Sequence, residues 1–391
     1  MEEKEILSEF TKSRVTEYAD LLNDIAESYL PEEKKEDEVY VTRADLFARK
    51  EMDRQRAVFY GVLRSASRQL AGLAKPVWGQ SSLAEKQEKR IVKELINAGI
   101  EIREFYKTEN RNGYTEIGML LRARERTYYD ADDIADLLTE VLHIRMLPPT
   151  EGHLYVKDEW TTFCFQEEPS FQIYGGYAKV TKEGEELSGD NYLMREFGDG
   201  TYIAAIADGM GSGEKACEDS EKVLLMVERH VESGLAVKSC IHMCDEMLYL
   251  QYRGERSVSL DLLELNLYTG ECRICKNGAA PSFLIRDRKV REFAADRLSL
   301  GINPRVDGYR ESVFLQSQDV MILASDGIMD LFYDNMEMFR SYVSGYVGHT
   351  LSDLAANILQ TAIRAGGGVI RDDMTVLAVG VCEKGVLPVA F

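Results

Sequence analysis

YIAAIADGMGSG, residues 202–213, joins a continuous apolar run to a glycine-rich loop. The run Tyr202–Ala207 predicts a buried strand, and the stretch Gly213–Ser233 that follows it predicts a helix. Asp208 therefore stands at the end of a strand, beside glycines that let the backbone or a ligand approach closely. The stretch indicates a ligand site at a strand-to-helix turn.

Three kinds of ligand site were considered for this loop. A Walker A phosphate loop needs Gly-Lys followed by Ser or Thr, but the chain reads Gly213-Glu214-Lys215. A dinucleotide fingerprint needs glycine at position 214. A divalent cation bound by the Asp208 carboxylate and the Gly209 carbonyl meets no such conflict. A glycine-rich turn with a purely structural role stays open as an alternative.

Further carboxylates lie beside other strand-like runs. Asp326 follows the run 320–324, Asp372 precedes the final run 375–381, and Asp190 is expected to follow another strand. Each alone is also compatible with an exposed turn. Together they place hard oxygen ligands at several strand ends of one domain, which predicts a site for Mg²⁺ or Mn²⁺.

The pattern beyond residue 150 predicts the fold class. Strand-like runs cluster as hairpins, and helical stretches appear in pairs between them, which is an α+β order rather than a β-α-β alternation. We predict a β-sandwich flanked by helix pairs. The expected strands are 154–165, 171–182, 202–207, 257–267, 272–276, 282–285, 309–315, 320–324 and 375–381, and the expected helices are 213–233, 236–252, 334–344 and 352–365.

The chain before residue 150 is organised differently. Region 1–80 carries two amphipathic helical stripes separated by the charge run Glu32–Glu38, and we predict a helical regulatory or dimerisation region. The stripes can pair within the chain or with a second copy, as in a homodimer. The pattern over residues 82–148 predicts a small α/β region of helix, hairpin and helix that ends at Pro148-Pro149. The third predicted domain is 150–383.

Composition excludes several classes of partner. A net charge of −20 argues against nucleic acid or an anionic membrane. No uncharged apolar run approaches the roughly 18 residues that span a bilayer, and the first residues do not resemble a signal peptide. Seven scattered cysteines indicate reduced thiols, and the pair Cys272 and Cys275 is better explained by strand alternation than by zinc. We expect a cytoplasmic protein.

The order and wording of these motifs resemble the PPM-type metal-dependent protein serine/threonine phosphatases. The closer resemblance is to the branch that contains stage II sporulation protein E, and it covers roughly residues 90–383. The motifs that carry it are Ser188-Gly189-Asp190, Asp208-Gly209-Met210-Gly211-Ser212-Gly213, Lys276-Asn277-Gly278-Ala279-Ala280-Pro281-Ser282-Phe283, Ser325-Asp326-Gly327 and Asp372-Asp373-Met374-Thr375.

This resemblance implies a role for each acid. Asp208 is expected to bridge two Mn²⁺ or Mg²⁺ ions, and the Gly209 carbonyl to bind one of them. Asp326 and Asp372 complete the protein ligands, and Asp190 acts through bound water. The ions would activate a water that attacks phosphorus directly, without a covalent phosphoenzyme. Asp208, Asp326 and Asp372 are thus the expected catalytic residues.

The resemblance also supplies a substrate hypothesis. It implies hydrolysis of phosphoserine on a regulatory protein, with a phosphorylated anti-sigma-factor antagonist as the expected partner. Asp373 is expected to support the ligands rather than bind an ion. The alternative is a catalytically silent module that keeps the fold and regulates a sigma-factor or sporulation pathway. Nucleotide binding at the glycine-rich loop is a third hypothesis.

Overall fold

The computed structural model describes residues 85–386, apart from 111, 125–127, 150–153, 253, 295–296, 303–310 and 347–349, and short stretches between 19 and 67. The described parts of 19–27 and 50–67 are helical, as predicted. The charge run Glu32–Glu38 and the stripe residues Val15, Tyr18, Ile25, Tyr29, Leu70 and Leu73 lie outside the described residues. Among the helices that are described, none combines the length and the apolar character that crossing a bilayer requires.

The described residues form two compact units. The first comprises the described parts of 85–169 with residues 198–200, and the second those of 19–67, 170–197 and 201–386. In the first unit, four strands pair in the order β1-β2-β6-β4. The helices α3 and α4 share an apolar core with this sheet. The elements are α3 Glu85–Asn97, β1 Ile100–Glu109, β2 Thr115–Ala123, β3 Tyr129–Asp130, α4 Ala131–Leu142, β4 Met146–Leu147, β5 Tyr155–Val156 and β6 Thr161–Glu167.

The predicted helix, hairpin and helix of this unit are present. Gly99 ends the first helix with a φ of 88°, a conformation that glycine adopts readily. Asp130 caps α4, since its side chain accepts a hydrogen bond from the backbone N–H of Asp132. β6 pairs with β2, so this sheet includes residues beyond Pro148-Pro149. The predicted domain boundaries themselves stay predictions.

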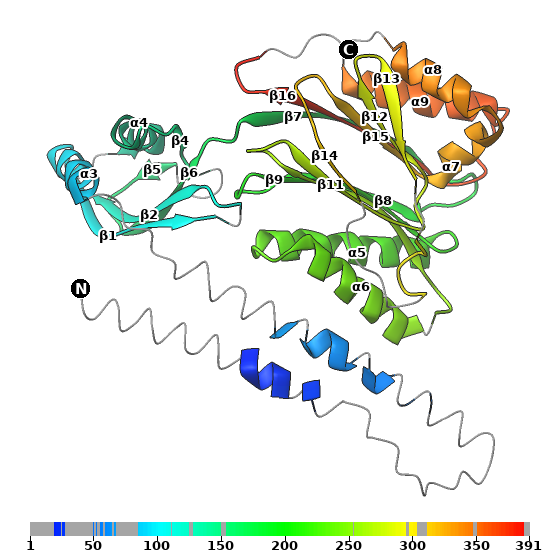
Figure 1. The fold of residues 1–391 in the computed structure, drawn as a ribbon, viewed down its shortest axis with the longest axis horizontal. Coiled ribbons are helices and arrows are strands. Elements are labelled where there is room, and N and C mark those ends of the chain that lie inside the picture. Colours follow the sequence, from blue (N-terminus) through cyan, green and yellow to red (C-terminus); the bar gives the residue numbers. More distant parts are fainter. Residues whose placement is uncertain are drawn as a thin grey trace, which may run out of the picture. The chain divides into compact units, whose positions relative to one another are not determined.

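The second unit is a sandwich of two antiparallel sheets covered by helices on both sides (Figure 1). One sheet has the order β14-β11-β10-β9-β8 and the other β13-β12-β15-β16-β7. The first sheet consists of β8 Asp190–Glu196, β9 Thr201–Gly209, β10 Val258–Asn266, β11 Glu271–Asn277 and β14 Glu311–Phe314. The second consists of β7 Phe171–Val180, β12 Ser282–Arg286, β13 Lys289–Phe293, β15 Val320–Ala324 and β16 Met374–Glu383.

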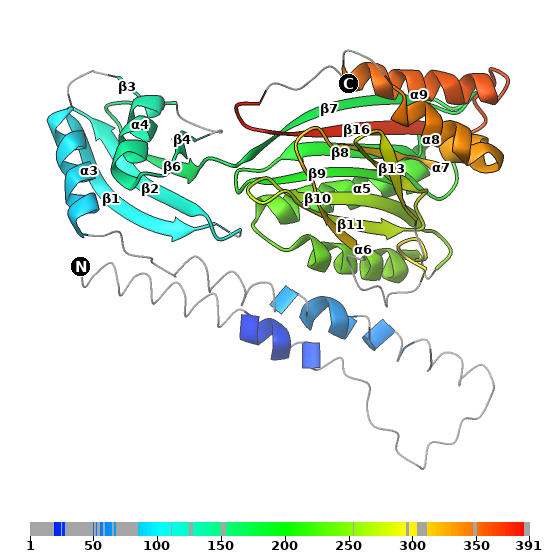
Figure 2. The ribbon, with the colours of Figure 1, turned by 45° about the horizontal axis from the view of Figure 1, so that its top comes forward.

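Two helix pairs cover the outer faces of these sheets, which confirms the predicted α+β sandwich (Figure 2). The helices α5 Glu214–Glu232 and α6 Val237–Tyr252 share one core with the first sheet. The short α7 Asp326–Met329, the 3₁₀ helix η1 Asp330–Asn335, α8 Met336–Ser344 and α9 Leu351–Ala365 follow β15 and pack with the second sheet. A third core fills the space between the sheets.

Four elements differ from the prediction. The strand expected over 154–165 is two strands in different sheets, β5 and β6. Asp190 was expected after a strand, but it begins β8, which the prediction omitted. β8 opens with the polar pair Asp190-Asn191 and is only partly buried beyond Asp190, so its apolar signal is weak. The edge strand β13 was also omitted because it mixes charged and apolar residues. The helix expected from 334 to 344 is preceded by α7 and η1, which start at Asp326 itself.

β7 and α9 approach each other closely at Gly176. A Cβ atom placed on Gly176 would lie 2.2 Å from the backbone nitrogen of Ser352, at the start of α9. A Cβ on the neighbouring Gly175 would meet only side chains, at 2.5 Å from the terminal methyl group of Met194. The side chain of Met194 can adjust, whereas the backbone of α9 can move only with its helix.

We therefore expect Gly176→Ala to destabilise the protein by about 1–3 kcal/mol, because the added methyl group forces α9 away from the sheet. Gly175→Ala is the matched control and should cost less. Urea unfolding followed by circular dichroism measures both. Equal midpoints for the two variants would show that the contact with α9 does not constrain the sheet.

Candidate metal centre

Two of the predicted acids come from the first sheet. Asp190 begins β8 and lies directly opposite Asp208, near the end of β9, in the antiparallel register. The backbone N–H of Gly209 donates to the carbonyl of Gly189 at 3.2 Å. A Cβ atom on Gly209 would lie 2.1 Å from the carbonyl oxygen of Ala216, so only glycine allows the first turn of α5 to pack here. The glycine-rich loop thus brings a helix start against two carboxylates.

The other two acids flank neighbouring strands of the second sheet. Asp326 follows β15 as the first residue of α7, and Asp372 precedes β16. Ser325 joins these segments: its N–H donates to the Thr375 carbonyl at 2.9 Å, and its Oγ accepts from the Thr375 N–H at 2.9 Å. A Cβ on Gly327 would lie only 2.1 Å from the carbonyl oxygen of Asp373, so the two segments are in close contact.

The carboxylates of the two sheets lie within electrostatic range of each other. Burial is the main cause that raises the pKa of Asp208, to about 8, and the charges of Asp190, Asp326, Asp372 and Asp373 raise it further. Nearby carboxylates disfavour the ionised form of a carboxyl group, so this shift is expected where several acids are gathered in one place. The structure therefore brings all four predicted acids to one end of the sandwich.

The pKa values of Asp190 and Asp326 are raised for the same reason as that of Asp208. Burial raises the pKa of Asp190 to about 6, against the lowering effect of the neighbouring hydroxyl groups of Thr375 and Ser325. Burial also raises the pKa of Asp326, and the charge of Asp372 adds to this shift. The Oδ2 atom of Asp190 is buried and accepts no hydrogen bond from the described residues.

These features fit a cation better than a structural turn. A buried, unsatisfied carboxylate oxygen and several mutually repelling carboxylates are stabilised when a positive charge is placed among them. In the described part of the chain, no group of three or more His, Cys, Asp or Glu side chains is placed so that it could hold an ion. The structure therefore brings the acids to one end of the sandwich without arranging them as a complete ligand set.

The sequence did not reveal two further residues near this centre. Lys179 on β7 donates from Nζ to the backbone carbonyl of Asp190 at 2.6 Å. Glu185 accepts a hydrogen bond from Ser212 Oγ at 2.9 Å, next to the start of α5. Both contacts depend on which strands and loops meet, and a single lysine or glutamate in the sequence carries no signal for that.

Comparison with known proteins relates this geometry to a family. Residues 198–381 match the family model for stage II sporulation protein E (SpoIIE). A solved structure of the PP2C phosphatase domain and a fragment of the regulatory domain of SpoIIE from Bacillus subtilis superimposes with a TM-score of 0.65 at 27% identity, covering 89% of this chain and 100% of that one. The chain is thus similar to the SpoIIE branch of the PPM-type phosphatases.

Two curated relatives show how far the similarity extends along the chain. Stage II sporulation protein E of Bacillus subtilis (strain 168) is 29% identical over 353 residues, which are 89% of this chain and 42% of the relative. Phosphoserine phosphatase RsbX of the same organism is 29% identical over 100 residues, 26% of this chain and 47% of the relative. The chain therefore spans less than half the length of each of these two relatives.

Asp373 makes different contacts from those expected of its neighbour Asp372. Its Oδ1 accepts from the backbone N–H of Lys182 at 2.9 Å, and its Oδ2 accepts from that of Gly189 at 2.7 Å. The buried carboxylate thus holds both ends of the loop that leads to Asp190. This arrangement agrees with the expectation that Asp373 supports the ligands rather than binding an ion.

We expect Asp373→Ala to lower the free energy of unfolding by roughly 1–3 kcal/mol, because a buried N–H at Gly189 loses its acceptor. Asp373→Asn should cost less, since the amide oxygen can still accept one of the two bonds. Guanidinium unfolding measures stability, and calorimetric titration with Mn²⁺ measures whether Asp190 stays in place. Wild-type stability in the alanine variant would contradict the supporting role of Asp373.

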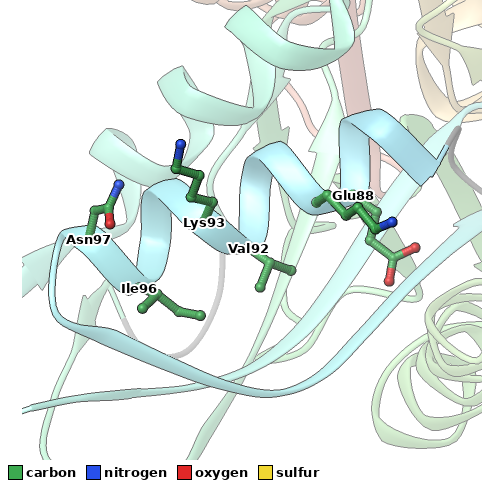
Figure 3. Close-up of a pocket in the computed structure, with 6 residues that line it drawn as sticks. Glu88, Val92, Lys93, Ile96 and Asn97 are labelled. Carbon is green, nitrogen blue, oxygen red and sulfur yellow. The ribbon is translucent and has the colours of Figure 1, made fainter.

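Other sites suggested by single features do not add to this centre. A hollow of about 420 Å³ lies on α3 and is lined by Glu88, Lys89, Val92, Lys93, Ile96 and Asn97 (Figure 3). None of these residues is a predicted ligand. Cys272 packs in the core between the sheets and Cys275 in the core under α5 and α6, so the pair points to opposite faces and cannot bind one zinc ion.

Proposed function

We propose that the chain is a metal-dependent serine/threonine protein phosphatase. The observation that carries the proposal is the meeting of Asp208, Asp190, Asp326 and Asp372 at one end of the sandwich, where burial, together with the charges of the other acids, raises the pKa of Asp208 to about 8. The match to the SpoIIE family model and the similarity to a solved PP2C phosphatase domain support it. The similarity to a protein named phosphoserine phosphatase supports serine as the phosphorylated residue.

Two Mn²⁺ or Mg²⁺ ions are the proposed cofactors. Asp208, Asp326 and Asp372, with the Gly209 carbonyl, would hold them, and Asp190 would contribute through water. When bound, such ions supply an acidified water and neutralise charge on the phosphate. The chain's own residues hold this set in place through the Ser325 contacts to β16 and the clamp of Asp373 on the loop before Asp190.

Lys179 has a positioning role in this proposal. Its ammonium group holds the carbonyl of Asp190, which fixes the start of β8 against β7 of the other sheet. Hydrolysis by a water needs no nucleophilic side chain, which agrees with the deep burial of Cys240, Cys244, Cys272 and Cys275. Burial also raises the pKa of Cys275 to about 12, so this thiol is not a ready nucleophile.

The partner is proposed at a finer level than the reaction. A phosphorylated anti-sigma-factor antagonist is the proposed substrate protein, and it rests on the resemblance to the SpoIIE branch. The cytoplasmic location and a homodimer through the N-terminal helices stay predictions from the sequence. The second candidate function is a silent module that binds a regulator. The cluster of buried carboxylates argues against the silent module. Without bound ions, the repulsion between these carboxylates would destabilise the fold and serve no purpose.

Release of inorganic phosphate from a synthetic phosphoserine peptide tests the proposal. We expect release with Mn²⁺ and none after chelation, with activity restored when Mn²⁺ returns. Calorimetry separates the candidates: a silent module would neither bind Mn²⁺ at millimolar concentration nor release phosphate. ATP or NAD that raised the melting temperature in the absence of metal would favour nucleotide binding instead.

A further inference from the structure

Three large apolar side chains are exposed on the loops that carry the carboxylates. Leu187 is 47% exposed, Met210 59% and Val369 45%. Each lies within three residues of a candidate metal ligand in the sequence. We call these three side chains the apolar rim. Exposed apolar groups gathered beside a site are a common mark of a binding surface.

Hydrogen bonds tie the three loops of the apolar rim together. Ser212, two residues after Met210, donates to Glu185, two residues before Leu187, at 2.9 Å. The N–H of Glu183, on the same loop as Leu187, donates to the carbonyl of Ile370 at 2.9 Å, next to Val369. The three loops that carry the rim residues are therefore joined to one another beside the carboxylates.

Charge alone does not explain how a phosphoprotein would bind here. The chain carries a net charge of −20, which two divalent ions at the centre would not reverse, so the protein as a whole does not attract an anionic partner over long range. Burial of apolar surface can supply the binding free energy instead. A small phosphate ester that reaches the carboxylates has no groups that extend to the rim, whereas a polypeptide does.

We propose that the apolar rim binds apolar residues that flank the phosphoserine of a protein substrate. This inference rests on the proposed phosphatase function and adds to it a substrate class, namely phosphoproteins with aliphatic residues beside the modified serine. The metal centre would hydrolyse any phosphoserine that can reach it. The rim would decide which sequences are bound well.

Two phosphoserine peptides test the rim with the full chain and Mn²⁺: one has Leu and Val on both sides of the phosphoserine, and the other has Gly and Ser. The wild type should prefer the aliphatic peptide in kcat/KM. In the double variant Leu187→Ser, Val369→Ser, the ratio of the two kcat/KM values should fall roughly tenfold or more, because two apolar contacts are lost. The change should appear mainly in KM.

The matched control is the double variant Leu225→Ser, Met338→Ser, whose side chains are 41% and 45% exposed on α5 and α8. It should keep the wild-type ratio. An unchanged ratio in the rim variant, or the same fall in the control, would overturn the inference while leaving the phosphatase intact. A rim variant that alters the mass measured by light scattering would assign the surface to a second copy of the chain. A wild type inactive on both peptides and on p-nitrophenyl phosphate would remove the proposed function with it.

Discussion

Asp208→Asn should reduce Mn²⁺-dependent phosphate release by at least roughly a thousandfold, which corresponds to about 4 kcal/mol of transition-state stabilisation. The substitution keeps the shape of the side chain and removes the charge that the proposed ions require. It acts on the acid whose pKa is raised first by burial and then by the charges of Asp190, Asp326, Asp372 and Asp373. Steady-state rates on a phosphoserine peptide, measured over a range of Mn²⁺ concentrations, check the effect.

Glu214→Gln is the matched control for this loss. It removes one negative charge from the exposed first turn of α5, close to Asp208 in sequence, without touching a proposed ligand. We expect activity within about twofold of the wild type, because exposed charges contribute little. If Asp208→Asn kept more than a tenth of the activity at saturating Mn²⁺, the carboxylate centre would not be the site of hydrolysis.

The second large effect concerns stability in the absence of metal. The folded-state pKa of Asp208 is about 8, and that of Asp190 is about 6, both above the usual value of 3.8. The folded state therefore binds more protons than the unfolded state between about pH 4 and pH 8. The free energy of unfolding must fall as the pH rises through this window. Chelated wild-type protein should thus be most stable near its acid side and lose stability toward pH 8.

Asp208→Asn should reduce this slope, to which Asp190, Asp245 and Glu246 still contribute because burial raises their pKa values as well. At pH 8 and without metal, we expect the variant to be more stable than the wild type by roughly 2–4 kcal/mol, because a disfavoured charge is absent. With millimolar Mn²⁺, the wild type should gain stability and the variant should not. Thermal unfolding between pH 5 and pH 8, with and without Mn²⁺, measures both. Parallel curves for the two proteins would contradict the shifted pKa.

Most of the sandwich could be predicted because its strands are buried on both faces and read as continuous apolar runs. β9 and β15 are examples, since every residue from Thr201 to Ala207 and from Val320 to Ala324 is buried. β8 and β13 could not be predicted with the same rule, because β8 is only partly buried beyond Asp190 and β13 alternates exposed charges with apolar residues. Their strand character comes from pairing with a neighbour that the sequence does not identify.

The candidate site was predictable to the same extent as the strands that carry it. Asp208, Asp326 and Asp372 stand beside three easily recognised strands, so their positions at strand ends follow from the pattern. That the two sheets bring them together is a property of the tertiary fold, and the motif resemblance supplied it. Lys179 and Glu185 depend on register and loop contacts, which local sequence does not encode.

The acids of the centre are divided equally between the layers of the sandwich, with Asp190 and Asp208 on one sheet and Asp326 and Asp372 beside strands of the other. An ion held by both pairs would act as a cross-link between the two sheets at one end of the sandwich. Sliding one layer past the other by a single residue would then pull the ligand set apart long before the helices melt. Activity would report how well the layers are aligned, and a partner that shifted one layer could switch hydrolysis without approaching the substrate.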